Sequence, residues 1–187
     1  MAKFKFLAFI LLAVISTALT AQTKKIDPTK CTINWTGKKV TGQHTGTINL
    51  KDGALVFKNN KLKGGSFTVD MTSLTDTDMQ GEYQTKLNDH LKSEDFFGTA
   101  KFPVAKMDFT KISDKGNGKY SVTADLTIKN IKKPVTFEVQ VKGNTASGKI
   151  VIDRTKYDIK YKSGSFFENL GDKAIYDDFE LDIKLQF

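Results

Sequence analysis

The sequence predicts an all-β protein whose antiparallel strands close into a barrel, with a short helical insert around residues 80–93. The main observation is strict alternation of apolar and polar residues over 122–128, 135–141 and 179–187. A period of two with one polar face is typical of half-buried antiparallel strands. Barrel closure would remove exposed sheet edges. A two-sheet sandwich is the alternative that this pattern leaves open.

The other strands are inferred from the same alternation and from the turn signals between them. Asp52-Gly53 and Gly116-Asn117-Gly118 are typical of tight hairpins, because such residues accept positive backbone angles. With the three strands above, these segments give eight or nine strands. The further strands are expected over residues 32–37, 46–50, 54–58, 66–71, 102–112 and 147–152.

Two stretches interrupt the alternation and are expected to cover a mouth of the barrel. Within residues 72–99, Tyr83, Leu87 and Leu91 are spaced at i, i+4 and i+8, which predicts one apolar stripe of a short helix. Residues 153–176 form a long crossing rich in glycine and aromatic residues. Long connections in a compact domain are often functional.

The first 21 residues have the layout of a secretory signal peptide. Lys3 and Lys5 precede an apolar run from Phe6 to Ile15, and small residues follow. The run is about half of the roughly 20 residues that a membrane-spanning helix needs. We therefore predict cleavage after Ala18 or Ala21, a periplasmic or secreted protein with no stable membrane anchor, and one mature domain over residues 31–187.

The charge and cysteine content exclude several classes of protein. The formal net charge is +8, and removal of the two signal-peptide lysines lowers it to +6. The lysines are scattered along strands and no nucleic-acid-binding module is visible, so nucleic acid is not an expected partner. Cys31 is the only cysteine and cannot form an internal disulfide. The sequence leaves open whether the protein forms a homodimer.

The residues that could carry catalysis or bind a metal are few. His44 and His90 are the only histidines, which excludes a three-histidine metal site. Asp76 and Asp78 resemble the start of a calcium-binding EF-hand loop, but Leu87 occupies the position of the required bidentate glutamate. Neither a nucleophile elbow nor a specific activating partner for Cys31 is visible. We predict no enzyme, no cofactor and no metal site.

Arg154 is the only arginine among 29 basic residues. A lysine cannot reproduce its planar, bidentate donor geometry. Arg154 is therefore predicted to bind a carboxylate inside the protein, with Asp70, Asp172 or Asp177 as partner. Contact with the anionic head group of a ligand is the alternative.

Five motifs in order resemble the YceI-like family, the lipocalin-like polyisoprenoid-binding proteins of bacteria. They begin with "INWTGKKVTGQHTGTI" and "GGSFTVDMTSL", which contain Trp35 and Phe67. The most specific is "LNDHLKSEDFFGTAKFPVAKMDF", followed by "ADLTIKNIKKPVTFEV" and "IDRTKYDIKY". One departure is Tyr157-Asp158, where relatives often have Phe-Gly.

The resemblance implies an eight-stranded lipocalin-like barrel with an apolar tunnel that binds isoprenoid or other long amphiphilic lipids without catalysis. Aromatic side chains are the natural wall of such a tunnel, although alternation does not say which strand face points inward. Eleven of the fourteen phenylalanines lie after the signal peptide. The candidate wall residues are Trp35, Phe67, Phe96, Phe97, Phe102, Phe109 and Phe137. An enzyme acting on a lipid, and a filled barrel that works through its surface, are the alternative functions.

Overall fold

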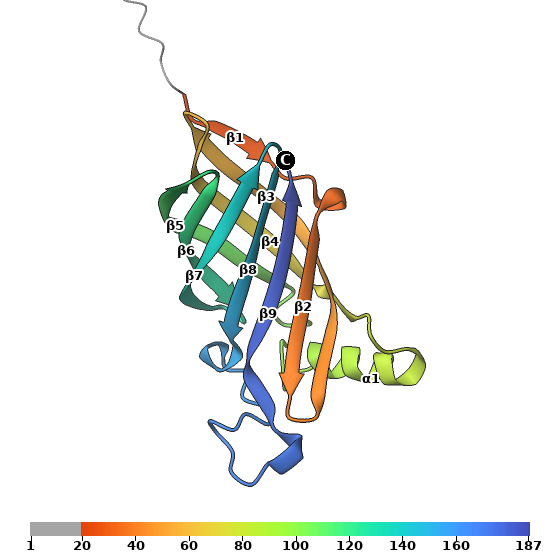
Figure 1. Ribbon diagram of the computed structural model, residues 1–187. Coiled ribbons are helices and arrows are strands. Elements are labelled where there is room, and N and C mark those ends of the chain that lie inside the picture. The colour runs from red at the N-terminus through yellow and green to blue at the C-terminus, as the bar shows by residue number, and fades with distance from the viewer. Residues whose placement is uncertain (1–19) are drawn as a thin grey trace, which may run out of the picture.

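The computed structural model describes residues 20–187, which form one antiparallel sheet with a single α-helix (Figure 1). The predicted signal peptide lies almost wholly outside the described residues. No helix within residues 20–187 has the length and apolar character needed to cross a membrane. The strands are β1 (Gln22–Lys25), β2 (Thr32–Lys39), β3 (Gly42–Lys58), β4 (Lys61–Asp76), β5 (Val104–Gly116), β6 (Lys119–Ile128), β7 (Ile131–Lys142), β8 (Thr145–Asp153) and β9 (Ile175–Gln186). The helical segments are α1 (Gly81–Lys92) and the short 3-10 turns η1 (Pro28–Lys30), η2 (Arg154–Tyr157) and η3 (Gly171–Lys173).

Strands β2 to β9 form a closed eight-stranded barrel, which confirms the predicted fold class. The sheet order is β1-β3-β2-β9-β8-β7-β6-β5-β4, and a further pairing of β3 with β4 closes the ring. Strand β2 pairs with the first part of β3, and β1 pairs with its later part, opposite Ala54–Phe57. The sandwich alternative is therefore wrong.

The alternating strands bury the apolar face that their sequence indicates. On β6, Tyr120, Val122, Ala124, Leu126 and Ile128 are all buried, while the intervening residues are partly exposed. The barrel interior is thus built from one face of each strand, as expected for a period of two.

The predicted turn at Asp52-Gly53 is wrong, because both residues lie inside the 17-residue strand β3. Its register shifts between Leu50 and Asp52, which is a β-bulge that lets one strand continue through a turn-like sequence. Gly53 is needed for close packing, since a Cβ there would lie 2.8 Å from the Phe67 ring. The hairpin turn is instead at Asn59-Asn60, where both φ angles are positive.

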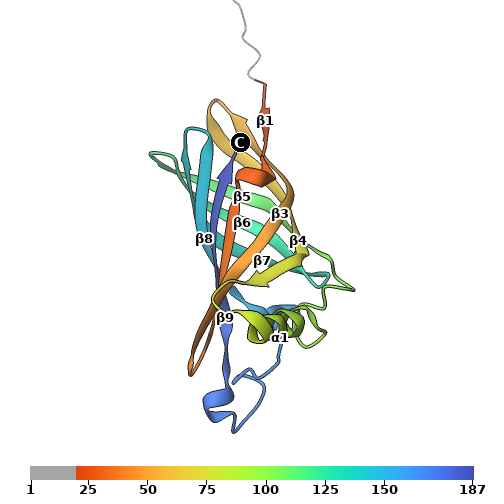
Figure 2. The ribbon, with the colours of Figure 1, turned by 90° about the vertical axis from the view of Figure 1, so that its right-hand side faces the viewer.

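Helix α1 lies across one end of the barrel, in the place where the insert was predicted (Figure 2). Leu87 and Leu91 face the barrel interior, but Tyr83 is 74% exposed and is not part of the packed stripe. Two amides attach the helix to the end of β4. Asn88 Oδ1 accepts a hydrogen bond from the Asp76 N–H at 2.7 Å, and Gln84 Nε2 donates to the Asp76 carbonyl at 2.7 Å.

Gly46 should be among the least replaceable residues of the barrel. A Cβ at Gly46 would lie 2.0 Å from the Thr75 carbonyl oxygen and 2.5 Å from the Trp35 ring. We expect Gly46→Ala to lower the free energy of unfolding by about 2–3 kcal/mol, because the strands must move apart. Gly37→Ala is the matched control, since no atom of residues 20–187 lies within 4 Å of its added Cβ. Equal urea midpoints for the two variants would contradict this packing.

Candidate functional site

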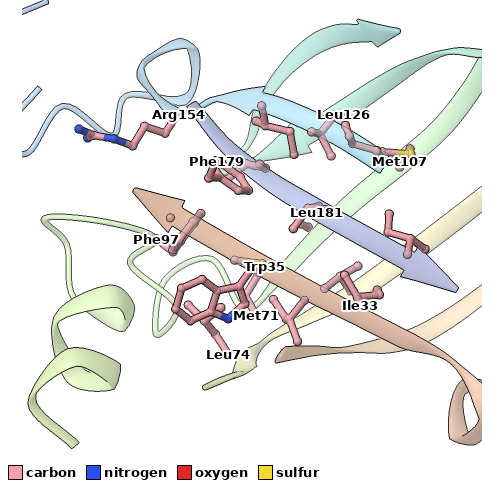
Figure 3. Close-up of a pocket in the computed structure, with 18 of the residues that line it drawn as sticks. Ile33, Trp35, Met71, Leu74, Phe97, Met107, Leu126, Arg154, Phe179 and Leu181 are labelled. Carbon is pink, nitrogen blue, oxygen red and sulfur yellow. The ribbon is translucent and has the colours of Figure 1, made fainter. Parts of the chain in front are cut away.

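An apolar cavity of about 230 Å³ lies inside the barrel (Figure 3). Its wall comes from the inner faces of the strands and from Leu87 and Leu91 of α1. On β9 alone the wall extends from Ile175 to Leu185, and ten strand residues span about 33 Å. The cavity is therefore long and narrow.

Six of the seven predicted wall residues line this cavity. Phe102 does not, because it lies in the connection between α1 and β5, where its ring packs beside the Lys101 ammonium group at 5.4 Å. The six residues that do line it are Trp35, Phe67, Phe96, Phe97, Phe109 and Phe137.

The aromatic residues gather in two places along the wall. The ring of Phe109 lies 5.4 Å from that of Phe67 and 6.0 Å from that of Phe137, measured between centroids. Phe97 and Phe179 form a second, T-shaped pair at 6.1 Å (Figure 3). Most of these rings are only half-buried because one face of each borders the cavity.

The sequence predicted six of the aromatic wall residues but not Phe179, and it left out much of the aliphatic wall. The inward stripe of β9 was visible as an alternating pattern, but only the closed barrel shows that this face points inward. The wall residues outside the prediction include Ile33, Met71, Leu74, Met107, Leu126, Ile150, Phe179, Leu181, Ile183 and Leu185.

The cavity reaches the surface where the β2–β3 hairpin meets the start of β9. Lys39 and Tyr176 line it and are both exposed, as is Asp178. The Val40 N–H at the hairpin tip donates to the Ala174 carbonyl at 3.2 Å, which ties the hairpin to the long loop before β9. These residues surround a mouth that carries lysine side chains.

Arg154 is a structural clamp at this end of the barrel. Its side chain is only 5% exposed and donates to the carbonyls of Ile159 at 2.7 Å, Ile175 at 3.0 Å and Tyr176 at 3.1 Å. Asp177 is the carboxylate partner among the three candidates, with Nη2 to Oδ1 at 3.6 Å. Burial lowers the pKa of Arg154, and Asp177 opposes that shift. Most guanidinium donors are thus committed to holding the loop onto β9.

The departure at Tyr157-Asp158 begins three positions after this arginine. Asp158 adopts φ 58° and ψ 35°, the left-handed region that favours glycine. Tyr157 is buried, and burial raises its pKa to about 12. Its hydroxyl has no hydrogen-bond partner within residues 20–187.

We expect Tyr157→Phe to raise the free energy of unfolding by about 1 kcal/mol, because an unsatisfied buried hydroxyl is removed. Tyr120→Phe is the matched control. The Tyr120 hydroxyl accepts a hydrogen bond from the Leu62 N–H at 3.3 Å in a buried site. Tyr120→Phe removes this acceptor and should therefore lower the free energy of unfolding by about 1 kcal/mol. Chemical denaturation of both variants gives the comparison. A destabilised Tyr157→Phe would show that this hydroxyl is satisfied in solution.

The segment His90–Phe97 forms a packed corner beside the cavity. The His90 ring makes edge contacts with Phe96 at 5.0 Å and Tyr161 at 4.6 Å, and its Nε2 lies 3.4 Å from Asp95 Oδ2. Phe96 is buried, whereas Asp95 is exposed. His90 is not a wall residue; His44 is, at the mouth end.

Cys31 lies half-buried after η1. Its Sγ donates to the Asp27 carbonyl at 3.1 Å, and burial raises the pKa of the thiol. A raised pKa disfavours the thiolate that nucleophilic attack requires.

Comparison with known proteins places this barrel among relatives of similar sequence. A UPF0312 protein of Shewanella denitrificans is 36% identical over 98 residues, which are 52% of this chain and 49% of the relative. A UPF0312 protein of Photorhabdus laumondii is 32% identical over 143 residues, covering 69% of this chain and 66% of the relative. The chain therefore spans about half the length of the first relative and about two thirds of the second.

Solved structures share the fold at low sequence identity. BcnA of Burkholderia cenocepacia superposes with a TM-score of 0.64 at 22% identity, over 86% of this chain and 98% of that chain. A polyisoprenoid binding domain from Saccharophagus degradans gives a TM-score of 0.57 at 14% identity, over 86% of this chain and 95% of that chain. The YceI-like domain family matches residues 25–187, which include all eight strands of the barrel. The chain therefore belongs to the YceI-like family.

Proposed function

We propose that this protein is an exported, non-catalytic carrier that holds a polyisoprenoid or similar long amphiphilic lipid in the barrel. The observation that carries this proposal is the long, narrow and apolar cavity with the lysine-bearing mouth described above. The printed name of the Saccharophagus domain, a polyisoprenoid binding domain, supports the same class of ligand. A filled barrel is disfavoured because a cavity of about 230 Å³ remains inside this one.

The shape of the cavity favours a flexible chain over a compact ligand. Each buried methylene contributes about 0.8 kcal/mol, so a long tail needs no strong polar anchor. The volume is small for a tail of many isoprene units, and such a tail requires wall side chains to move apart. Met71 and Met107 suit this role because methionine is unbranched and repacks readily.

We place the ligand head group near Lys38 and Lys39 rather than at Arg154. The two lysines line the cavity at the mouth, where an anionic or polar head would meet water. Lys38 Nζ already pairs with Glu180 Oε1 at 2.5 Å, whereas Lys39 has no ion-pair partner among the described residues and is the freer of the two. The guanidinium of Arg154 already donates to three backbone carbonyls. A head group at Arg154 would have to displace those contacts.

The alternative of a lipid-modifying enzyme requires a general base that faces the cavity. His44 meets this requirement in part, since it lines the mouth and its Nδ1 lies 3.1 Å from Asp78 Oδ1. Within residues 20–187 the wall away from the mouth is almost wholly apolar, which leaves little to activate a bond deep in the tail. We therefore favour binding over catalysis.

Export follows from the predicted signal peptide. Cleavage after Ala21 would leave Gln22, the first residue of β1, at the new N-terminus. Every described strand would then remain in the mature protein.

Trp35 gives a direct test because it is the only tryptophan and it lines the cavity. Titration with ubiquinone-8 in detergent should quench its fluorescence and saturate at one equivalent, since a quinone held in the barrel is close to the indole. Free N-acetyltryptophanamide in the same detergent serves as the control. Quenching that stays linear and equals that of the free indole would contradict the carrier function.

A further inference from the structure

Three potential metal ligands meet at the junction between the barrel and the loop before α1. His44 lies near the start of β3, Asp76 ends β4, and Asp78 follows two residues later. One ligand atom from each lies within 4.8 Å of the others. His44 and Asp78 are already in contact, with Nδ1 to Oδ1 at 3.1 Å.

Asp76 provides a second, independent observation at this cluster. The residue is only 1% exposed, and its Oδ1 accepts a hydrogen bond from the Met79 N–H at 2.8 Å. Its Oδ2 is buried and has no hydrogen-bond partner among the described residues. No lysine or arginine of residues 20–187 forms an ion pair with it. A buried carboxylate with one oxygen unpaired and no counter-charge is costly, so native structures supply a cation or a proton.

The surrounding backbone holds both carboxylates in place. The Thr45 N–H donates to Asp78 Oδ2 at 2.7 Å, as the Met79 N–H does to Asp76. Such outer contacts orient the ligands of metal sites and are part of their design. They also leave one oxygen of Asp76 free to coordinate.

We propose that His44, Asp76 and Asp78 form a binding site for a first-row divalent cation such as Zn²⁺. One imidazole nitrogen and two carboxylate oxygens suit zinc, which takes three protein ligands and a water in open sites. Calcium fits less well, because it prefers six to eight oxygen ligands. The half-exposed side chains of His44 and Asp78 give the cation a path from solvent.

A cation at this site would join three segments that close one end of the barrel. It would link β3 and the end of β4 to the loop that leads into α1. Leu87 and Leu91 of that helix line the cavity, as His44 does. The cation would therefore fix the position of the helix, and its binding does not depend on the proposed lipid.

Isothermal titration of metal-free protein with ZnCl₂ tests the site. We expect one Zn²⁺ per chain, and at least tenfold weaker binding in Asp76→Asn and in His44→Gln. Asp95→Asn is the matched control, because it removes the carboxylate of the other histidine pair, His90–Asp95 at 3.4 Å. That variant should bind Zn²⁺ as the parent does.

The stability of Asp76→Asn separates loss of the site from loss of the fold. Asparagine has nearly the size of aspartate, and its Oδ1 can still accept a hydrogen bond from the Met79 N–H. The substitution nevertheless removes a buried negative charge. In EDTA, Asp76→Asn should therefore melt at a higher temperature than the parent, while Zn²⁺ should stabilise only the parent. The proposal would be overturned if Asp76→Asn bound Zn²⁺ as tightly as the parent, or if Asp95→Asn lost Zn²⁺ binding. Absence of any stoichiometric Zn²⁺ binding would also overturn it, and a proton shared between Asp76 and Asp78 would then account for the buried oxygen.

Discussion

Phe109→Asp should weaken binding of ubiquinone-8 at least a hundredfold while the barrel stays folded. Phe109 lies at the centre of the aromatic cluster with Phe67 and Phe137 and is half-buried against the cavity. A carboxylate there must lose its water when an apolar tail enters, which costs several kcal/mol. In the lipid-free protein the same carboxylate can stay hydrated inside the cavity, so the fold tolerates it.

Phe102→Asp is the matched control for this prediction. Phe102 is also a half-buried phenylalanine close in sequence, but it does not line the cavity. The two variants make the same change in size and charge, so only the position differs. Trp35 quenching and far-ultraviolet circular dichroism compare them with the parent. Equal affinity of the two variants would show that the tail does not occupy this part of the barrel.

Arg154→Met should lower the free energy of unfolding by about 3 kcal/mol, because breaking a buried charge cluster leaves the remaining groups unpaired. The carbonyls of Ile159, Ile175 and Tyr176 would lose their donor, and Asp177 would lose its cation. Lysine cannot reach all these acceptors, so Arg154→Lys should recover only part of the loss.

The double variant Arg154→Met/Asp177→Asn identifies the origin of that effect. Removing the orphaned carboxylate should restore part of the stability lost in Arg154→Met, as measured by urea denaturation. Limited proteolysis should show faster cleavage between residues 158 and 174, the loop that Arg154 holds. Unchanged stability together with lost lipid binding would instead assign Arg154 to the head group.

The fold was predictable because alternation is a local property of the strands. The stripe Phe179, Leu181, Ile183 and Leu185 is visible in the sequence, and these residues line the cavity. Which face points inward depends on barrel closure, which is a non-local property of all eight strands. Phe102 was therefore wrongly assigned to the wall, since an aromatic residue next to a strand need not face the barrel interior.

The features that the sequence did not predict have a common physical origin in long-range packing. Asp52 and Gly53 are residue types that favour a turn. Pairing with β4 nevertheless keeps both residues in β3, with a bulge between Leu50 and Asp52. Likewise His44 and Asp76 are far apart in sequence and meet only because Gly46 pairs with Asp76 across β3 and β4. The EF-hand pattern covers a continuous stretch of sequence, and His44 lies outside that stretch.

Native mass spectrometry of the mature protein, purified from the exported fraction of its own host, tests the central claim most directly. The carrier function predicts one bound lipid per chain, which organic extraction releases as a quinone, a polyprenyl phosphate or a fatty amphiphile. The same preparation of Phe109→Asp should carry no such mass. A clean lipid-free mass for the parent, unchanged after incubation with isoprenoid lipids, would contradict the account and indicate a barrel that acts through its surface.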